Sequence, residues 1–214
     1  LNPGFRRYRF ATTVYLSPCN WWTMSWNICC RNLTENLQNT PGIYAEATLN
    51  NFGGVCDNSP RFADNGVPFL CINAPISYNP GASDPNGNNM LFQLVDARLD
   101  STNAVLYRAP HSGVEPIPGV YINPISGQLD FSVSVAGNYV VVIKVSTYNS
   151  SGQLIGTVMR DLMFVFRVCD GSPPVANDIS NMTGVAASGP SSVAVCNGQY
   201  FCVDMVVNDA NPAA

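Results

Sequence analysis

A loop of alternating oxygen-bearing side chains is the first place in the sequence where residue types and spacing suggest chemistry. In the run DPNGNN, Asp84, Asn86 and Asn88 stand at every second position. Hard cations such as Ca²⁺ take carboxylate and carbonyl oxygens from tight turns, so these three residues form a candidate calcium site. An EF-hand would need glycine in place of Asn89 and glutamate in place of Val95, which excludes that motif. Asparagine and glycine also form ordinary turns, and a plain turn is the alternative.

Aromatic side chains offer a second kind of chemistry, because their faces stack on the rings of sugars. The candidate ligand-binding residues of this kind are Trp21, Trp22 and Tyr107. Trp22 and Trp26 share strand parity, so they lie on one face of an extended chain. The alternative therefore assigns this pair to the inner face of a sheet, as part of the core.

Catalytic motifs are missing from the sequence, which contains no nucleophile elbow, HExxH, P-loop or GxGxxG run. His111 is the only histidine, and no orienting partner is apparent near it. It lies in a poorly patterned stretch, Leu99 to Pro118, that we expect to form a long exposed loop. We therefore expect a protein that is not an enzyme and has no cofactor, calcium aside.

The charge of the chain limits its partners. Charged residues make up 11% of the chain, the net charge is −4, and Lys144 is the only lysine. No basic patch is available to neutralise phosphates, so we exclude nucleic acid as a partner. The sequence has no run of 18 consecutive apolar residues, so we expect that it does not span a membrane.

An internal repeat sets the expected domain organisation. The run CDNSPRF at Cys56 returns as CDGSPPV at Cys169, a separation of roughly the 100 residues of one β-sandwich domain. An aromatic-flanked cysteine follows each copy, at Cys71 and at Cys202. The repeat predicts a piece of a longer chain. It would comprise the C-terminal part of a preceding β module (1–56), one complete immunoglobulin-like module (57–170) and the truncated start of a following module (171–214).

Period-two patterns and turn residues predict strands throughout the chain. The clearest alternation lies in Gln128–Val135, and Asp161 interrupts the last long strand as a bulge, an ion pair or an outward-facing polar residue. No segment of helical length has a 3.6-residue period, so we expect an all-β chain of tandem immunoglobulin-like (cadherin/PKD-like) β-sandwich modules. The expected strands are Arg6–Leu16, Trp21–Cys29, Ile43–Leu49, Phe69–Ile72, Ile76–Tyr78, Met90–Ala97, Val120–Ile122, Gln128–Val135, Tyr139–Tyr148 and Gln153–Val168.

Eight cysteines indicate an oxidising, extracytoplasmic setting in which disulfides brace the modules. No CxxC pair occurs, so the spacing of a zinc site is missing. A bridge between Cys71 and Cys169 would join the first and last strands of the complete module; the alternative is that each bonds across a module boundary. Cys29 and Cys30 would point to opposite faces of an extended chain and so bond different partners. The candidate disulfide cysteines are Cys19, Cys29, Cys30, Cys56, Cys71, Cys169, Cys196 and Cys202.

Five motifs resemble, in order, the repeating modules of the SprB-type gliding-motility surface adhesins of Bacteroidetes. They are WNICCRN from Trp26, CDNSPRF from Cys56, DPNGN from Asp84, GNY from Gly137 and GTVMRD from Gly156. The DPNGN block is also similar to bacterial cadherin-like and PKD-like sandwiches, where it usually carries more aspartates.

The resemblance implies a structural and adhesive repeat segment of a large secreted adhesin, involved in gliding motility and surface attachment. It implies an extracellular, cell-surface location associated with the outer membrane. The implied partners are neighbouring modules of the same chain, the type IX secretion and gliding machinery, and polysaccharide or a solid surface. The alternative function is a carbohydrate-binding β-sandwich module of an extracellular protein.

Overall fold

The computed structural model describes residues 7–54, 56–63, 66–169, 175–189, 192–196 and 199–208. Over these residues the chain is all-β apart from one short 3₁₀ turn, Phe52–Gly54. Contacts divide it into two compact units, Leu1–Arg167 (unit 1) and Val168–Ala214 (unit 2). Among the described residues, no helix is long and apolar enough to cross a membrane.

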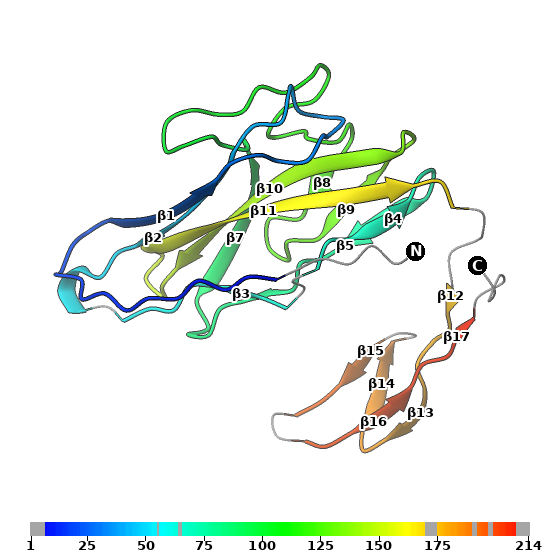
Figure 1. Cartoon of the computed structure of the whole chain (residues 1–214). Helices are drawn as coiled ribbons and strands as arrows, with labels where there is room; N and C mark the ends of the chain where they lie inside the picture. The colour runs from blue at the N-terminus through cyan, green and yellow to red at the C-terminus, as the bar shows by residue number, and fades with distance from the viewer. Residues whose placement is uncertain are drawn as a thin grey trace. The chain divides into compact units, whose positions relative to one another are not determined.

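The main sheet of unit 1 has the strand order β1-β2-β11-β10-β7 (Figure 1). These pairs are antiparallel, and β4 adds to the far end of β11 in parallel. The strands are β1 (Trp22–Ile28), β2 (Ile43–Leu49), β4 (Phe69–Cys71), β7 (Asn89–Val95), β10 (Gly137–Tyr148) and β11 (Leu154–Arg167).

A second, smaller sheet packs on the inner face of the main sheet and closes the sandwich. It has the order β5 (Pro75–Tyr78), β9 (Leu129–Ser132), β8 (Tyr121–Ile122), and a short ladder joins β3 (Arg61–Phe62) to β6 (Ala82–Ser83). Phe164 on β11 meets Phe131 on β9 and Tyr78 on β5, with ring centroids 5.3 and 5.0 Å away. Unit 1 is thus an immunoglobulin-like β-sandwich, which confirms the expected fold class.

Both faces of β10 are buried, which explains its unbroken apolar run VVVI. Val141 and Ile143 point into the sandwich core, while Val140 and Val142 point to the outer face. Residues 31–38 and 97–118 cover that outer face, and Leu37 and Val105 from them are buried against it. The stretch 99–118, expected to be an exposed loop, therefore contributes to a second apolar core.

Asn36 takes the place of a strand partner beside β10. β7 pairs with β10 only over residues 142–148, which leaves Val140 without a partner on that side. The fully buried Asn36 side chain accepts a hydrogen bond from Val140 N at 3.0 Å and donates to Val140 O at 2.7 Å. It also donates to Pro116 O at 3.0 Å, so one amide joins both covering segments, 31–38 and 97–118, to the sheet.

Arg31 and Asp161 form a buried ion pair at the edge of β11. Arg31 Nη1 donates to Asp161 Oδ1 at 2.6 Å, and Nη2 donates to Oδ2. The Arg31 and Asp161 side chains retain only 3% and 11% of their accessible surface. Arg31 Nε also donates to Gly42 O at 3.0 Å, so the guanidinium ties the 31–42 segment to the sheet. Of the interpretations open for Asp161, the ion pair is confirmed.

The boundary expected at residue 56 is wrong. β2 pairs with β11 through Leu49, Thr48 and Ala47, so residues 22–49 belong to the same sheet as the module expected at 57–170. A repeat in sequence does not reveal that an earlier hairpin completes the later sheet, because strand pairing is non-local. The boundary expected at 170/171 falls in 170–174, outside the described residues.

Over its described residues, unit 2 forms three two-stranded ladders. Its strands are β12 (Val175–Ala176) with β17 (Val207–Asn208), β13 (Ser180–Thr183) with β16 (Cys202–Asp204), and β14 (Ala186–Gly189) with β15 (Ser192–Ala194).

Removing one member of the Arg31–Asp161 pair should destabilise unit 1 severely. Arg31→Met leaves the buried Asp161 carboxylate without its counter-ion, and we expect a loss of about 3–5 kcal/mol in the free energy of unfolding. The double variant R31M/D161L should recover most of that loss, because no buried charge remains. Denaturant unfolding measures both. As control, Arg98→Met breaks the half-exposed pair with Glu46 and should cost about 0–1 kcal/mol; equal losses for both single variants would contradict this account.

Candidate functional site

Asp84 organises the loop that the sequence proposes as a cation site. Its Oδ1 accepts hydrogen bonds from Asn86 N at 2.9 Å and Asn88 N at 3.0 Å. Gly87 has φ 75°, in the left-handed region that glycine adopts without strain. One carboxylate oxygen is therefore used to form the turn, and the other, Oδ2, is buried with no hydrogen-bond partner.

Asp57 is a second carboxylate at this loop, and the sequence analysis did not assign it. Asn88 Nδ2 donates to Asp57 Oδ1 at 2.8 Å. Asn58 donates to Asn86 Oδ1 from its backbone N at 2.8 Å and from its side chain at 3.0 Å. The two asparagines thus join residues 57–58 to the loop. The available signal was the repeated Cys-Asp element, in which Asp57 follows Cys56.

The two carboxylates influence each other electrostatically. Burial raises the pKa of Asp57, and the negative charge of Asp84 raises it further. A cation between the two would neutralise both and give the buried Asp84 Oδ2 a partner. Among the described residues no group of three or more His, Cys, Asp or Glu could hold a metal, so Asp57, Asp84 and turn oxygens would form the ligand set. Calcium binding stays a prediction, and two carboxylates imply a weak site.

The tryptophans of β1 lie on the inner face of the main sheet. Directly paired residues share a face, and Met24 pairs with Ala47, Ala47 with Val158, and Val158 with Val145 in the sandwich core. Trp22 and Trp26 have the parity of Met24, so the expected shared inner face is confirmed.

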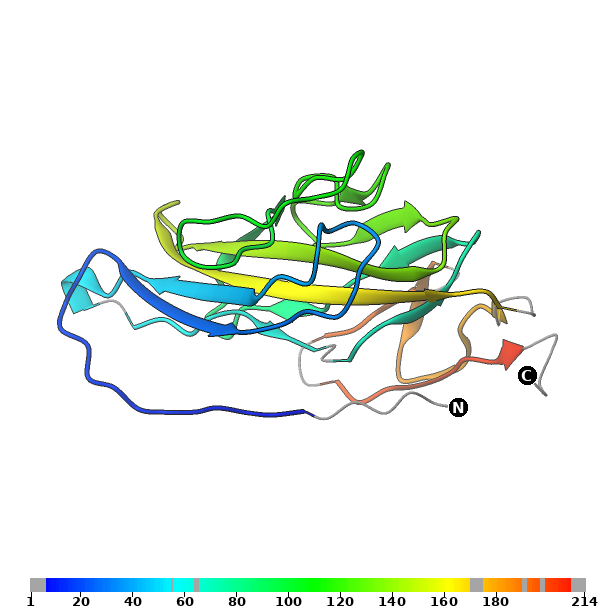
Figure 2. The same ribbon diagram turned by 45° about the horizontal axis from the view of Figure 1, so that its top comes forward.

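The assignment of these tryptophans to the core is wrong, because the described part of the sandwich core contains no residue of β1 or β2. Trp26 is 45% exposed and Trp21 is 44% exposed. Trp22 is half-buried, and its indole Nε1 donates to Ser17 O at 3.0 Å. Phe10 stacks against Trp26 with ring centroids 6.4 Å apart. The aromatic side chains on this face are therefore largely open, and residues 7–18, drawn in Figure 2 as an extended trace without strand arrows, reach them through Phe10.

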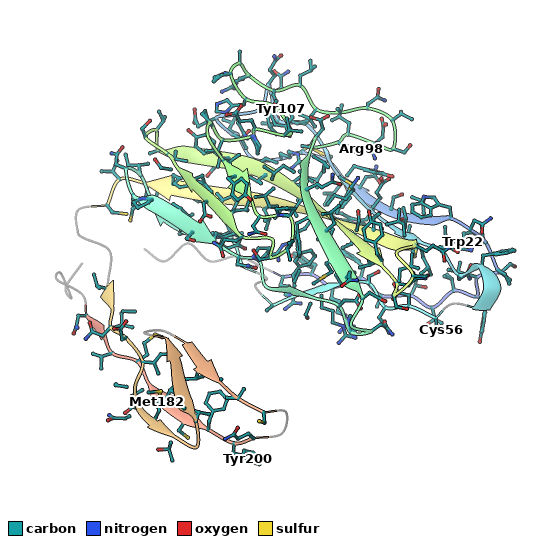
Figure 3. The ribbon with its side chains drawn as sticks, turned by 180° about the vertical axis from the view of Figure 1, so that it is seen from behind. Trp22, Cys56, Arg98, Tyr107, Met182 and Tyr200 are labelled. Atoms are coloured by element: carbon teal, nitrogen blue, oxygen red, sulfur yellow. A yellow bond between two sulfur atoms is a disulfide. The ribbon has the colours of Figure 1, made fainter. Side chains whose placement is uncertain are left out.

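Tyr107 is not part of that aromatic surface. It packs against the outer core and its hydroxyl accepts a hydrogen bond from Ala97 N at 2.9 Å. Burial raises its pKa to about 12. Figure 3 shows Tyr107 and Trp22 in different regions of unit 1. The structure therefore does not bring the three candidate ligand-binding residues together. Tyr107 instead helps to fix the segment 97–118 on the outer face of the sheet.

A polar pocket of about 250 Å³ on the outer face has no counterpart in the sequence analysis. Arg98 Nη1 donates to Glu46 Oε1 at 2.8 Å, and Glu46 Oε2 accepts from the Tyr44 hydroxyl at 2.7 Å. Asp96 and Lys144 also line it. These groups come from β2, β10 and the segment after β7, so no local pattern could have identified them. The pocket contains charges of both signs, and Arg98 and Tyr44 both hydrogen-bond to Glu46, an arrangement that suits a structural role better than the binding of an anion or a cation.

The cysteines differ from expectation in two respects. Cys29 and Cys30 bond to each other, with Cα atoms 3.7 Å apart, instead of to separate partners. The expectation assumed an extended chain, but β1 ends at Ile28 and Cys30 has φ 73°, which turns the backbone. Cys71 and Cys169 are disulfide-bonded, and their mutual pairing stays a prediction. The described residues also include four free cysteines: Cys19, Cys56, Cys196 and Cys202.

His111 is half-buried instead of lying in solvent. Its ring meets that of Tyr139 at a centroid distance of 6.0 Å, beside a pocket of about 240 Å³ that includes Ser132 and Ser134. The described contacts show no carboxylate hydrogen-bonded to His111, so the arrangement lacks the orienting group of a nucleophilic triad.

Comparisons with known proteins give no family. No protein-family model and no curated protein matches the chain. Among solved structures, it is similar to the N-terminal four immunoglobulin domains of Dscam1 isoform 4.44, with 16% identity and a TM-score of 0.26, over 78% of this chain and 41% of that one. Isoform 9.44 gives 14% identity, a TM-score of 0.26, and coverage of 78% and 40%. The chain thus spans less than half the length of these proteins.

Asp57 should give the protein a measurable dependence on pH and calcium. Because its folded pKa is raised, folded Asp57 binds a proton more tightly than unfolded Asp57. Its stabilising contribution is therefore present below the ordinary value of 3.8 and is lost as the pH rises through the folded pKa. In chelator, native protein should lose stability relative to Asp57→Asn over that interval, as thermal melts at several pH values would measure.

Added calcium should raise the melting midpoint of native protein but not of D57N. Asp130→Asn, which changes an exposed carboxylate on β9, serves as the matched control and should retain the calcium response. If the melting midpoint of native protein did not change in millimolar calcium, this loop would not be a calcium site.

Proposed function

We propose that the chain is a structural and adhesive segment of an extracellular surface protein, without catalytic activity of its own. The observation that carries this proposal is the exposure of aromatic side chains at β1: Trp26 is about half exposed on a strand without charged residues, and Trp21, just before the strand, is exposed to a similar extent. A sandwich with a filled core that still presents large aromatic side chains has a surface suited to association.

The disulfides support the extracellular location. Cys29, Cys30, Cys71 and Cys169 are oxidised, and such bonds persist outside the reducing cytoplasm. The bond between Cys29 and Cys30 immediately precedes Arg31, so it also stiffens the segment that carries the buried ion pair.

The finer proposal is a repeat segment of a SprB-type gliding adhesin, exported by the type IX system, associated with the outer membrane and contacting polysaccharide or a solid surface. Its support comes from the sequence motifs. Two pairs of those motifs are in contact: Arg31 of CCRN binds Asp161 of GTVMRD, and Asp57 of CDNSP binds Asn88 of DPNGN. Motifs that hold one fold together would recur as a set in modules of that fold.

Beads coated with the native protein should attach to glass or to a polysaccharide panel in a saturable manner. The double variant W21A/W26A should weaken half-maximal attachment by roughly thirtyfold, the equivalent of about 2 kcal/mol for a central aromatic contact. Leu33→Ala, which shortens an exposed side chain in a loop, is the matched control and should attach like native protein. If native and heat-denatured, reduced protein attach equally weakly, adhesion does not reside in this segment.

A carbohydrate-binding module is the second candidate, favoured by the exposure of Trp21 and Trp26 in particular. Sugars stacking on an indole change its emission, so titration with soluble glycans should shift or quench tryptophan fluorescence. Trp26→Phe keeps a stacking face and should retain part of the affinity, whereas Trp26→Ala should lose it. A flat fluorescence response across a broad glycan panel, with attachment to glass retained, would favour the adhesive function over this one.

A further inference from the structure

β1 leaves one side of the main sheet open. It is the terminal strand of the sheet order, and no described residue pairs with its free side. Natural edge strands are usually protected by lysine, proline or a bulge, whereas the run WTMSWNI contains no charge and no proline. Its backbone N–H and C=O groups therefore offer a template for another strand.

Residues 10–16 have the composition of a strand but pair with no strand in the described part of the chain. The run FATTVYL is β-branched and aromatic, and the structure assigns it no strand, contrary to the strand expected at Arg6–Leu16. Val14 is 59% exposed, and Phe10 and Tyr15 are more exposed still. The chain thus carries a donor-like segment as well as an open acceptor edge.

The two segments match in one antiparallel register. With Leu16 opposite Trp22, Val14 stands opposite Met24 and Phe10 opposite Ile28, so these three apolar pairs lie on the inner face. Thr12 is the one polar residue there, opposite Trp26. The polar residues of β1 lie on the other face, where Thr13 stands opposite Ser25, Tyr15 opposite Thr23 and Ala11 opposite Asn27. A shift by one residue would move Leu16, Val14 and Phe10 to the face of Thr23, Ser25 and Asn27, which separates them from the apolar side chains of β1 and is therefore less favourable.

Within one chain, residues 10–16 are held away from the free side of β1. Ser17 O accepts hydrogen bonds from Trp22 Nε1 at 3.0 Å and from Asn51 Nδ2 at 3.2 Å. Asn51 Oδ1 also accepts from Cys19 N at 2.7 Å. These bonds fix residues 17–19 beside the end of β2, and the Phe10 ring then meets the inner-face side chain of Trp26. The segment touches that face at Trp26, leaves it largely open, and leaves the free side of β1 unpaired among the described residues.

We propose that β1 accepts residues 10–16 of a second copy of this chain as an added antiparallel strand, in a reciprocal exchange. Neither strand carries a charge, so the exchange desolvates none, and Arg7 and Arg9 lie outside the ladder. This inference goes beyond the proposed function, since it requires no outside ligand.

The size of the contact indicates a weak dimer. Each copy contributes seven residues of β1 and seven of the donor segment, fewer than the roughly 20–30 residues a side of a standard stable interface. We expect a dissociation constant in the micromolar range or weaker, which repetition along a filament or on a surface would strengthen through avidity.

Sedimentation velocity over a concentration series tests the exchange, with the free thiols alkylated so that they cannot cross-link. Native protein should show a monomer–dimer equilibrium. Val14→Glu in the donor and Met24→Lys in the acceptor should each raise the dissociation constant at least roughly tenfold, because each places a lone charge opposite an apolar side chain. Leu33→Glu, a charge on an exposed loop residue, is the matched control and should dimerise like native protein.

A mixture of the V14E and M24K variants gives the decisive test of a reciprocal exchange. In a reciprocal exchange one ladder then pairs the introduced glutamate with the introduced lysine, and the other ladder retains Val14 opposite Met24. The mixture should therefore dimerise although neither variant does alone.

Three results would overturn the proposal. The first is native protein that stays monomeric, and the second is loss of the dimer with M24K but not with V14E, which indicates β1–β1 pairing. The third is concentration-independent amide protection of residues 10–16, which indicates pairing within one chain. Bead attachment is read separately, so failure of adhesion and failure of self-association are distinguishable.

Discussion

The fold of unit 1 depends on a buried ion pair between Arg31 and Asp161. β11 is bordered by β2 over residues 156–158 and by β4 over 165–167, and Asp161 lies in the interval between them. A carboxylate there is tolerable only because the Arg31 guanidinium meets it with two hydrogen bonds. Desolvation offsets much of the attraction, so the pair specifies position more than it adds stability. It determines where the 31–42 segment lies, and with it Asn36 and the cover of β10.

This constraint changes how the sequence motifs are understood. The runs CCRN and GTVMRD meet at the ion pair, and the runs CDNSP and DPNGN meet where Asn88 binds Asp57. Their residue types are those required for long-range polar contacts inside a β-sandwich. The residues that make these motifs recognisable thus have structural roles. The surfaces available for function lie in segments outside these motifs.

The two faces of the main sheet differ in how completely they are covered. On the outer face, residues 31–38 and 97–118 bury Leu37 and Val105, and the charged groups there lie in the Arg31–Asp161 pair and in one small pocket. On the inner face, the second sheet covers β10, β11 and β7, but the inner side chains of β1 remain outside the core. An open apolar face beside an open strand edge is therefore a consequence of a second sheet narrower than the first.

The sequence by itself determined the local structure: period two and turn residues predicted nine of the observed strands of unit 1 within a few residues, as in Ile43–Leu49 and Tyr139–Tyr148. It also predicted that Trp22 and Trp26 share a face, and that the Asp84 loop is a tight turn. Only the tertiary structure decided that residues 22–49 complete the later sheet, that Asp57 joins Asp84, that Cys29 bonds Cys30, and that Trp26 is exposed. The reason is physical: side-chain period and turn propensity act between near neighbours, whereas strand pairing, coverage and burial depend on segments far apart in the chain, such as those of Arg31 and Asp161, which are 130 residues apart. The Cys29–Cys30 bond is local, but it depends on the turned backbone at Cys30, which residue types alone do not predict.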